Sequence, residues 1–234
     1  TQAESSAASD VYKRQNFVNS EKLDTKNYKK ALKNSDAIIV PGGFGDRGIE
    51  GMILAAKYAR ESKTPYFGIC LGLQIAIIEM TRSLLKLKDA NSTEFKKRVK
   101  NNVISLVTEW KNEDGTIERR NHKSDKGGTM RLGAQVAFLK NGTLAKSLYK
   151  KSSIFERHRH RYEVNPSYVP ELEKHGLIVS ARSEMHNLVE MIELKNHPWF
   201  VACQFHPEFT SKPKKGHPLF NDFIKAAEIK RDKK

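Results

Sequence analysis

The spacing of apolar positions along the chain predicts alternating strands and helices. Short apolar runs bounded by turn-forming residues are typical of strands, and they occur at 37–40, 66–69, 103–107, 135–139, 155–164, 177–180, 188–194 and 200–205. Three segments, 49–60, 71–83 and 218–229, instead repeat apolar residues every three or four positions, which predicts amphipathic helices. Because strands and helices alternate, we expect an α/β fold with a doubly wound, mainly parallel sheet and functional loops at the carboxyl ends of its strands.

The remaining segments set the expected domain limits. Residues 109–130 are polar and contain glycines, which predicts a long loop. Residues 1–15 are small and polar without a strand pattern, so we expect an unstructured or foreign lead. One domain is then expected at 16–229, followed by a basic tail at 230–234.

Composition fits a soluble protein. With 234 residues, 38% of them hydrophobic, the chain is long enough to bury one sizeable core. Two cysteines argue against a disulfide framework and for a reducing compartment. The longest apolar stretch, 65–78, is interrupted by Gln74 and is too short to span a bilayer, and no signal peptide is visible. We therefore predict a cytoplasmic protein without a membrane partner.

The net charge of +15 raises the question of nucleic-acid binding. The lysines are scattered and interleaved with acids, and no helix-turn-helix, zinc-finger or RNA-binding signature occurs. We therefore expect no nucleic-acid partner. His158 and His160 are spaced to share a metal ion, but no cysteine or carboxylate set completes a site beside them, so no metal site is predicted.

The sequence 68–72, Gly-Ile-Cys-Leu-Gly, joins a predicted strand to a predicted helix. Cysteine between two such glycines has the pattern of a nucleophile elbow, in which a tight turn exposes the reactive side chain. At a helix N-terminus the helix dipole is expected to lower the pKa of the Cys70 thiol. The alternative is a buried structural cysteine, which is our interpretation of Cys203 within the apolar run 200–205.

Two other segments offer partners for Cys70. His206 and Glu208 follow a predicted strand and are two residues apart, so an extended backbone would direct both side chains to one side. They would then form a base and an orienting acid, although a surface histidine beside a turn is the alternative. The glycine-rich loop 41–48 and the N–H of Leu71 can supply amides for an oxyanion. Phosphate binding is the weaker interpretation of that loop, because no phosphate-binding consensus occurs.

Taken together, these segments resemble a known family. The strings PGGFG at 41–45, GICLG at 68–72 and FHPE at 205–208, in that order, resemble a class I glutamine amidotransferase domain. Further strings at 89–95, 123–133 and 156–165 are similar to the glutaminase half of bacterial-type CTP synthases and distinguish the chain from GMP synthases and anthranilate synthases. The resemblance covers residues 16–229.

The resemblance implies a role for particular residues. It makes Cys70 the nucleophile, His206 the base and Glu208 the orienting acid of a glutamine-hydrolysing site. Glu94 would bind the α-ammonium group of L-glutamine and Arg161 its α-carboxylate. The full set of implied glutamine contacts is Gly43, Leu71, Gly72, Leu73, Gln74, Glu94 and Arg161. The glutaminase step itself would need no cofactor.

The resemblance also implies a larger reaction. In the family a synthetase domain, normally N-terminal in the same polypeptide, uses ATP and Mg²⁺ to activate UTP, and ammonia from the glutaminase site converts it to CTP. GTP activates glutamine hydrolysis, and the assembly is a homotetramer. No segment of this chain resembles the synthetase part. The alternatives are a catalytically idle docking or regulatory module of the same fold and a basic nucleic-acid-binding protein; the intact set Cys70, His206 and Glu208 argues against idleness.

One departure from the family concerns the start of the domain. Relatives begin with an apolar strand and a helix before the segment that matches 16–23, and we find neither here. If that strand is a central one, the sheet would have a gap and an exposed edge. We therefore expect the chain to fold poorly on its own.

Overall fold

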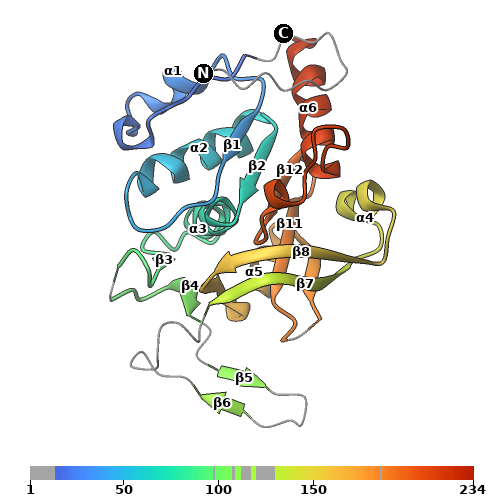
Figure 1. Cartoon of the computed structure of the whole chain (residues 1–234). Helices are drawn as coiled ribbons and strands as arrows, with labels where there is room; N and C mark the ends of the chain where they lie inside the picture. Colours follow the sequence, from blue (N-terminus) through green and yellow to red (C-terminus); the bar gives the residue numbers. More distant parts are fainter. Residues whose placement is uncertain (1–13, 97, 107–108, 112–116, 120–129, 185) are drawn as a thin grey trace.

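The computed structural model describes residues 14–96, 98–106, 109–111, 117–119, 130–184 and 186–234. Its main sheet has seven strands in the order β1-β2-β12-β11-β10-β7-β8 (Figure 1). The pairs β1/β2 and β2/β12 are parallel, and the other pairs are antiparallel. The strands are β1 (Ile38–Val40), β2 (Tyr66–Ile69), β7 (Arg131–Leu139), β8 (Ser153–His160), β10 (Leu177–Ser183), β11 (Val189–Leu194) and β12 (Phe200–Cys203).

The remaining elements surround this sheet. Strands β3 (Asn91–Ser92), β4 (Asn102–Leu106) and β9 (Tyr162–Val164) form a second, three-stranded sheet, and β5 (Glu109–Lys111) pairs with β6 (Ile117–Arg119). The helices are α1 (Tyr28–Leu32), α2 (Ile49–Ser62), α3 (Leu71–Leu84), α4 (Leu144–Tyr149), α5 (Val169–Lys174) and α6 (Pro218–Arg231), with short 3₁₀ turns η1 (Ser20–Lys22), η3 (Pro166–Tyr168) and η4 (Pro207–Phe209).

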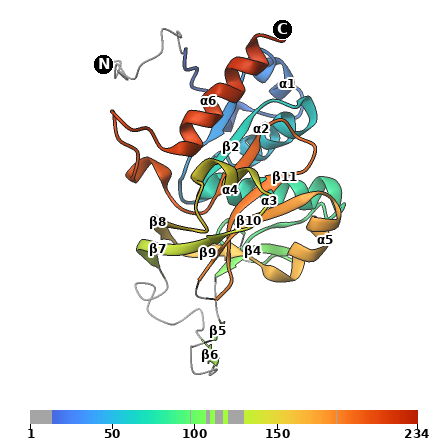
Figure 2. The ribbon, with the colours of Figure 1, turned by 90° about the vertical axis from the view of Figure 1, so that its right-hand side faces the viewer.

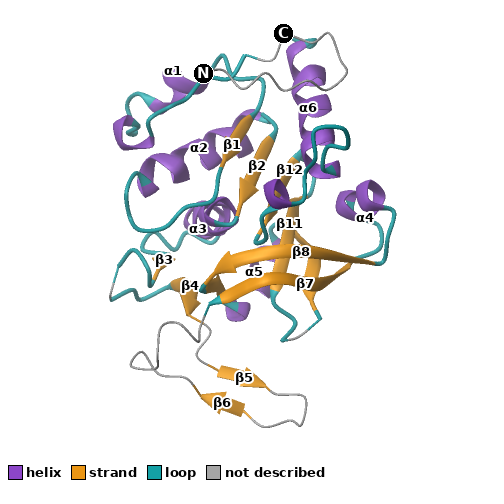
Figure 3. Ribbon diagram, viewed as in Figure 1, coloured by secondary structure: helices purple, strands orange, loops and turns teal. Residues whose placement is uncertain are grey.

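Helices cover both faces of the main sheet, with α1 to α3 on one side and α4 and α6 on the other (Figure 3). The alternation of side chains along β2 explains this arrangement. Tyr66 faces the first layer and stacks on Phe200 at a ring distance of 4.5 Å, whereas Phe67 faces the second and contacts Trp199 and Phe223. Since all these rings are buried, each stabilises the fold by about 1.5 to 3 kcal/mol.

Helix α3 lies at the centre of the molecule. Every residue from Leu71 to Thr81 is buried, because α3 packs against α2, the main sheet and the second sheet. The one carboxylate on this stretch, Glu79, accepts two hydrogen bonds of 2.8 Å from Arg60 of α2. A paired arginine compensates the desolvation of a buried acid. The apolar segment 65–78 is thus the core of the fold, and no helix in the described part of the chain has the length and apolar character needed to cross a membrane.

The structure confirms the α/β fold class and the three helices that periodicity predicted. The parallel pairing lies in β1, β2 and β12, whose carboxyl ends meet at one edge. The predicted strand 155–164 is wrong as a single element, because Arg161 separates β8 from β9, which pairs instead with β4. The predicted loop 109–130 contains β5 and β6; its residues 112–116 and 120–129 lie outside the described set.

The chain ends also bear on the predictions. Residues 1–13 of the predicted lead 1–15 lie outside the described residues. The predicted limits of the lead, the domain and the tail remain predictions. No gap interrupts the described main sheet, because each strand in the order β1-β2-β12-β11-β10-β7-β8 is hydrogen-bonded to the next. Strand β1 forms one edge of this sheet, and Ile39 in it is 39% exposed. At the other end Lys234 forms a 2.7 Å ion pair with Asp36, which places the end of the chain beside the segment before β1 (Figure 2).

Candidate active site

Cys70 occupies the sharp turn between β2 and α3. Its backbone has φ 51° and ψ −98°, an unfavourable conformation for a residue with a side chain. The turn is held by its amide N–H, which donates to the carbonyl of Cys203 at 2.7 Å. A Cβ on Gly68 would lie 2.6 Å from the carbonyl of Gly72, and one on Gly72 would collide with the carbonyl of Val40. The glycines are therefore required for close packing of β2, α3 and β1, whereas the strained residue is the cysteine itself.

Cys70 is buried, with 2% of the residue exposed. Burial raises its pKa to about 12, although a hydrogen bond from the amide of Leu71 acts in the opposite direction. The carboxylates of Glu163, Glu208 and Glu94 raise this pKa further. The expectation that the helix N-terminus lowers the pKa is therefore wrong for this structure, because desolvation outweighs the single amide. Cys70 is a neutral thiol here and needs a base to become a nucleophile.

His206, directly after β12, is positioned to be that base. Its Nδ1 lies 2.6 Å from Oε1 of Glu208, and its amide donates to the carbonyl of Arg157 at 2.8 Å. The ring of Phe209 stacks on the imidazole at a centroid distance of 5.0 Å. With Nδ1 bonded to the carboxylate, the lone pair is on Nε2, which is buried and has no hydrogen-bond partner among the described residues. That nitrogen is free to accept a proton.

The predicted geometry behind the His206–Glu208 pair was wrong. Alternation in an extended strand was expected to direct both side chains to one side. Strand β12 ends at Cys203, and Glu208 lies in the 3₁₀ turn η4, which begins at Pro207. The two side chains meet because this tight turn brings Glu208 back over the imidazole.

Gly42 shows how closely the base and the nucleophile approach each other. A Cβ on Gly42 would lie 2.8 Å from Cε1 of His206 and 3.5 Å from Cβ of Cys70. The loop after β1, the elbow after β2 and the histidine after β12 thus converge on one point. The carboxyl ends of parallel strands are where α/β proteins assemble their sites, and here only glycine leaves room between the two reactive groups.

The first turn of α3 and the glycine loop border the same point. A Cβ on Gly43 would lie 3.1 Å from Cδ2 of Leu71, so the loop lies against the start of the helix. Gln74 donates to the carbonyl of Tyr162 at 3.1 Å, while its Oε1 is buried without a partner in the described part of the chain. The sequence-predicted set on this turn, Leu71, Gly72, Leu73 and Gln74, is buried and lies next to Cys70.

Glu94 lies against the glycine loop, and Arg161 is close enough to Glu94 for their charges to interact. Oε1 of Glu94 accepts a 3.0 Å hydrogen bond from the amide of Gly45. Burial raises the pKa of Glu94, while the Gly45 amide and the charge of Arg161 act against this rise. Arg161, between β8 and β9, has a buried Nε with no partner among the described residues. A carboxylate can bind an ammonium group, and a guanidinium group can bind a carboxylate.

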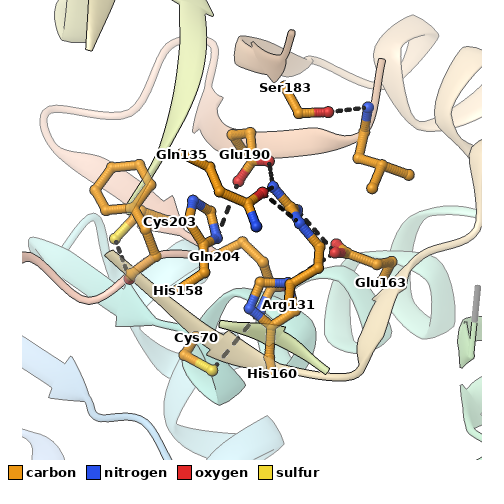
Figure 4. A network of polar contacts seen from close by, with 12 residues as sticks. Cys70, Arg131, Gln135, His158, His160, Glu163, Ser183, Glu190, Cys203 and Gln204 are labelled. Carbon is orange, nitrogen blue, oxygen red and sulfur yellow. Dashed lines mark hydrogen bonds and ion pairs between the residues drawn. The ribbon is translucent and has the colours of Figure 1, made fainter. Parts of the chain in front are cut away.

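Behind the thiol lies a buried charged cluster formed by Arg131, Glu163, Glu190, His158 and His160 (Figure 4). Arg131 donates to Glu163 at 2.8 Å and to Glu190 at 2.6 Å, and His160 Nε2 lies 2.7 Å from Glu163. Burial, with the charge of Arg131 next, lowers the pKa of His158 to about 2. Burial raises the pKa of Glu190 to about 7. From this cluster the charge of Glu163 acts on Cys70, whose pKa it raises.

The alternation along β8 explains how the arginine and histidine run is divided. His158 and His160 are buried, while Arg157 and Arg159 are exposed, and Arg159 lies over the ring of Phe44 at 5.5 Å. The two imidazole rings are 5.3 Å apart. Among the described residues no three His, Cys, Asp or Glu side chains are arranged so that they could hold a metal ion, and these two histidines contact Glu190 and Glu163 of the charged cluster.

The sequence reasoning did not identify every residue around the thiol. Gln204, fully buried, directs its Nε2 to within 3.7 Å of the Cys70 sulfur. Arg131 and Glu190 contact each other from positions 59 residues apart. Neither contact leaves a local signal, because each joins two residues that are distant in sequence.

Comparison with known proteins agrees with this geometry. Residues 2–226 match the family model for glutamine amidotransferase class-I. A solved structure described as the glutaminase domain of Trypanosoma brucei CTPS with bound acivicin is 38% identical, with a TM-score of 0.81, and the match covers 91% of this chain and 80% of that one.

A more distant structure shows the fold alone. A putative GMP synthase protein from Thermoplasma acidophilum is 18% identical, with a TM-score of 0.54, and the match covers 87% of this chain and 78% of that one. The family model extends over the elbow, the glycine loop and the His206–Glu208 turn. The chain therefore belongs to the class I glutamine amidotransferase family and is similar to a CTP synthase glutaminase domain.

Proposed function

We propose that this chain hydrolyses the side-chain amide of L-glutamine with Cys70 as nucleophile, His206 as base and Glu208 as the acid that orients the base. The observation that carries this proposal is the strained, buried Cys70 beside an imidazole whose Nδ1 is bonded to a carboxylate at 2.6 Å. A neutral thiol with a raised pKa is inert until a base takes its proton. His206 has an unpartnered Nε2 for that purpose, counting the described residues.

Substrate binding uses the two charged residues at the border of the site. Glu94 accepts the α-ammonium group of glutamine and Arg161 donates to its α-carboxylate. The side-chain amide then reaches Cys70, with the first turn of α3 and Gly43 around it. Charge matching at the amino-acid end fixes the distance to the amide, so that only glutamine-sized substrates place their carbonyl carbon at the sulfur.

The chemistry runs through a thioester. His206 takes the proton from Cys70, and the thiolate attacks the amide carbon to give a tetrahedral intermediate, whose oxyanion is bound by amides at Gly43 and Leu71. The C–N bond breaks as the nitrogen receives the proton from His206, and ammonia leaves. Water, deprotonated by His206, then attacks the γ-glutamyl thioester. The C–S bond breaks, the sulfur receives the proton from His206, and glutamate is released from the restored Cys70 thiol.

We further propose that the ammonia serves CTP synthesis, as the likeness to a CTP synthase glutaminase domain supports. In this proposal a synthetase domain binds ATP, Mg²⁺ and UTP and aminates UTP to CTP, and this chain binds none of the three. GTP would act as an activator of glutamine hydrolysis, and the complete enzyme would be a homotetramer in the cytoplasm.

Glutamate release from glutamine tests the proposed hydrolysis. We expect release by the unmodified chain, supplied with a CTP synthase synthetase domain with and without GTP, to fall to the uncatalysed level in Cys70→Ala. Cys203→Ala is the matched control, because Cys203 is a buried thiol in the same core that does not enter the mechanism. Equal release by Cys70→Ala would refute the role of Cys70 as nucleophile, whereas no release by any form would favour a docking module without activity.

A further inference from the structure

Gln204 occupies a position where an apolar residue would be expected. It is fully buried, as are its neighbours Cys203 and Phe205. Its amide N–H donates to the carbonyl of Glu190 at 2.8 Å, which fixes the backbone against β11. A buried carboxamide costs free energy unless its donor and acceptor find partners. Burying the Gln204 carboxamide therefore costs free energy, and packing alone does not explain why a polar side chain occupies this position.

The carboxamide contacts the reacting atom. Nε2 of Gln204 is 3.7 Å from Sγ of Cys70, within the range of a hydrogen bond to sulfur (Figure 4). Its Oε1 is buried and has no hydrogen-bond partner among the described residues. Since the nitrogen and oxygen of a carboxamide exchange places when the group rotates, the same side chain can accept from a thiol or donate to a thiolate.

The surroundings of the sulfur make such a donor important. The carboxylates of Glu94, Glu163 and Glu208 all disfavour a negative charge on Cys70, and burial does so more strongly. The Leu71 amide is the backbone donor that favours the thiolate. A second donor, neutral and fixed, would stabilise the charge that develops when His206 removes the proton.

We propose that Gln204 is a further catalytic residue, whose side-chain N–H donates a hydrogen bond to the Cys70 sulfur when the thiolate forms. The proposal rests on the proposed function, because it assigns a role within the same reaction. In the structure the carboxamide already directs Nε2 to the sulfur of the neutral thiol. Proton transfer to His206 makes this sulfur a charged and stronger acceptor for the same N–H.

The rate at which iodoacetamide alkylates Cys70 tests this contact without glutamine. Only the thiolate reacts, so the dependence of this rate on pH reports the pKa of the thiol. The experiment uses the full chain with Cys203→Ala, and the adduct is assigned to Cys70 by mass spectrometry. Gln204→Met keeps the size of the side chain and removes the donor. Gln135→Met is the control, since it removes a carboxamide that contacts Arg131 and not the sulfur.

A hydrogen bond to a charged group predicts that Gln204→Met shifts the pH–rate profile upward by about one unit, so that alkylation at a given pH slows about tenfold. The control should leave the profile unchanged. Equal profiles for Gln204→Met and Gln135→Met would overturn the proposal.

A second variant covers a failure of Gln204→Met to fold. Gln204→Glu keeps the shape of the side chain and places an acceptor beside the sulfur, so it should shift the profile upward at least as far; an unchanged profile would also overturn the proposal. Because alkylation needs no turnover, a chain that releases no glutamate would refute the proposed hydrolysis, whereas the alkylation profile judges the Gln204 contact by itself.

Discussion

Replacing Arg131 by methionine should destabilise the protein strongly. Arg131 is 8% exposed and donates to two buried carboxylates, Glu163 at 2.8 Å and Glu190 at 2.6 Å. In Arg131→Met, Glu163 keeps its contact with His160 at 2.7 Å, but the nearest remaining partner of Glu190 is His158 at 3.7 Å. The substitution therefore leaves a buried carboxylate without a cation.

The size of the effect follows from that loss. Breaking a buried ion pair by removing one partner costs about 3 to 5 kcal/mol, a large share of the total of about 5 to 15 kcal/mol that keeps a domain folded. For a domain of this size each kcal/mol moves the thermal midpoint by about 2 to 4 °C. The midpoint of Arg131→Met should thus fall by about 6 to 20 °C.

The loss should also depend on pH. Burial raises the pKa of Glu190 from 4.5 to about 7 in the folded protein, although Arg131 lowers it. Between these values the folded state binds more protons than the unfolded state, so stability falls as pH rises through this window. Without Arg131 the folded pKa of Glu190 rises further. The destabilisation should therefore be larger above pH 7 than near pH 5, where Glu190 is protonated.

Thermal unfolding followed by circular dichroism at several pH values measures both effects. The matched control is Arg47→Met, which breaks an arginine–glutamate pair of 2.8 Å with Glu21 at an exposed site and should change the midpoint little. The reasoning is refuted if Arg131→Met loses no more stability than Arg47→Met, or if its loss is the same at all pH values.

Three further predictions concern catalysis and the turn that supports it. Gly42→Ala places a Cβ 2.8 Å from Cε1 of His206 and should displace the imidazole from Cys70. The kcat for glutamine hydrolysis should therefore fall by about 100-fold, with little change in the thermal midpoint. An unchanged kcat would contradict this packing argument. Glu94→Gln removes the charge proposed to bind the α-ammonium group and should raise KM by about tenfold or more, whereas a change in kcat alone would assign Glu94 another role. Thr210→Val removes the 3.0 Å hydrogen bond to Glu156 behind the turn that carries the orienting acid. Denaturant unfolding should show that the free energy of unfolding falls by about 1 kcal/mol. An unchanged unfolding midpoint would show that this hydrogen bond does not stabilise the fold.

Strands and helices with strong apolar patterns were predictable from the sequence, and the short helices were not. The strand 66–69 and the helix that follows it carry strong apolar patterns, and the structure has both. Helices α1, α4 and α5 have five or six residues, which is too short for a helical period to be recognised. The break at Arg161 depends on the pairing of β9 with β4, which is a tertiary contact.

The candidate site shows the same division. Cys70, His206 and Glu208 were found from local motifs and their order, and the structure brings them together. The direction of the thiol pKa shift was wrong because it depends on burial, which a local motif does not encode. Gln204 lies 134 positions from Cys70, so their contact has no trace in a local pattern.

The central claim is that Cys70 carries a γ-glutamyl group during glutamine hydrolysis. Acid quenching of the chain during turnover of isotopically labelled glutamine, followed by peptide mass spectrometry, tests it most directly. The account predicts a labelled glutamyl thioester on the peptide that contains Cys70, and none in Cys70→Ala. Sustained glutamate release without label on Cys70, or label on another residue, would contradict it.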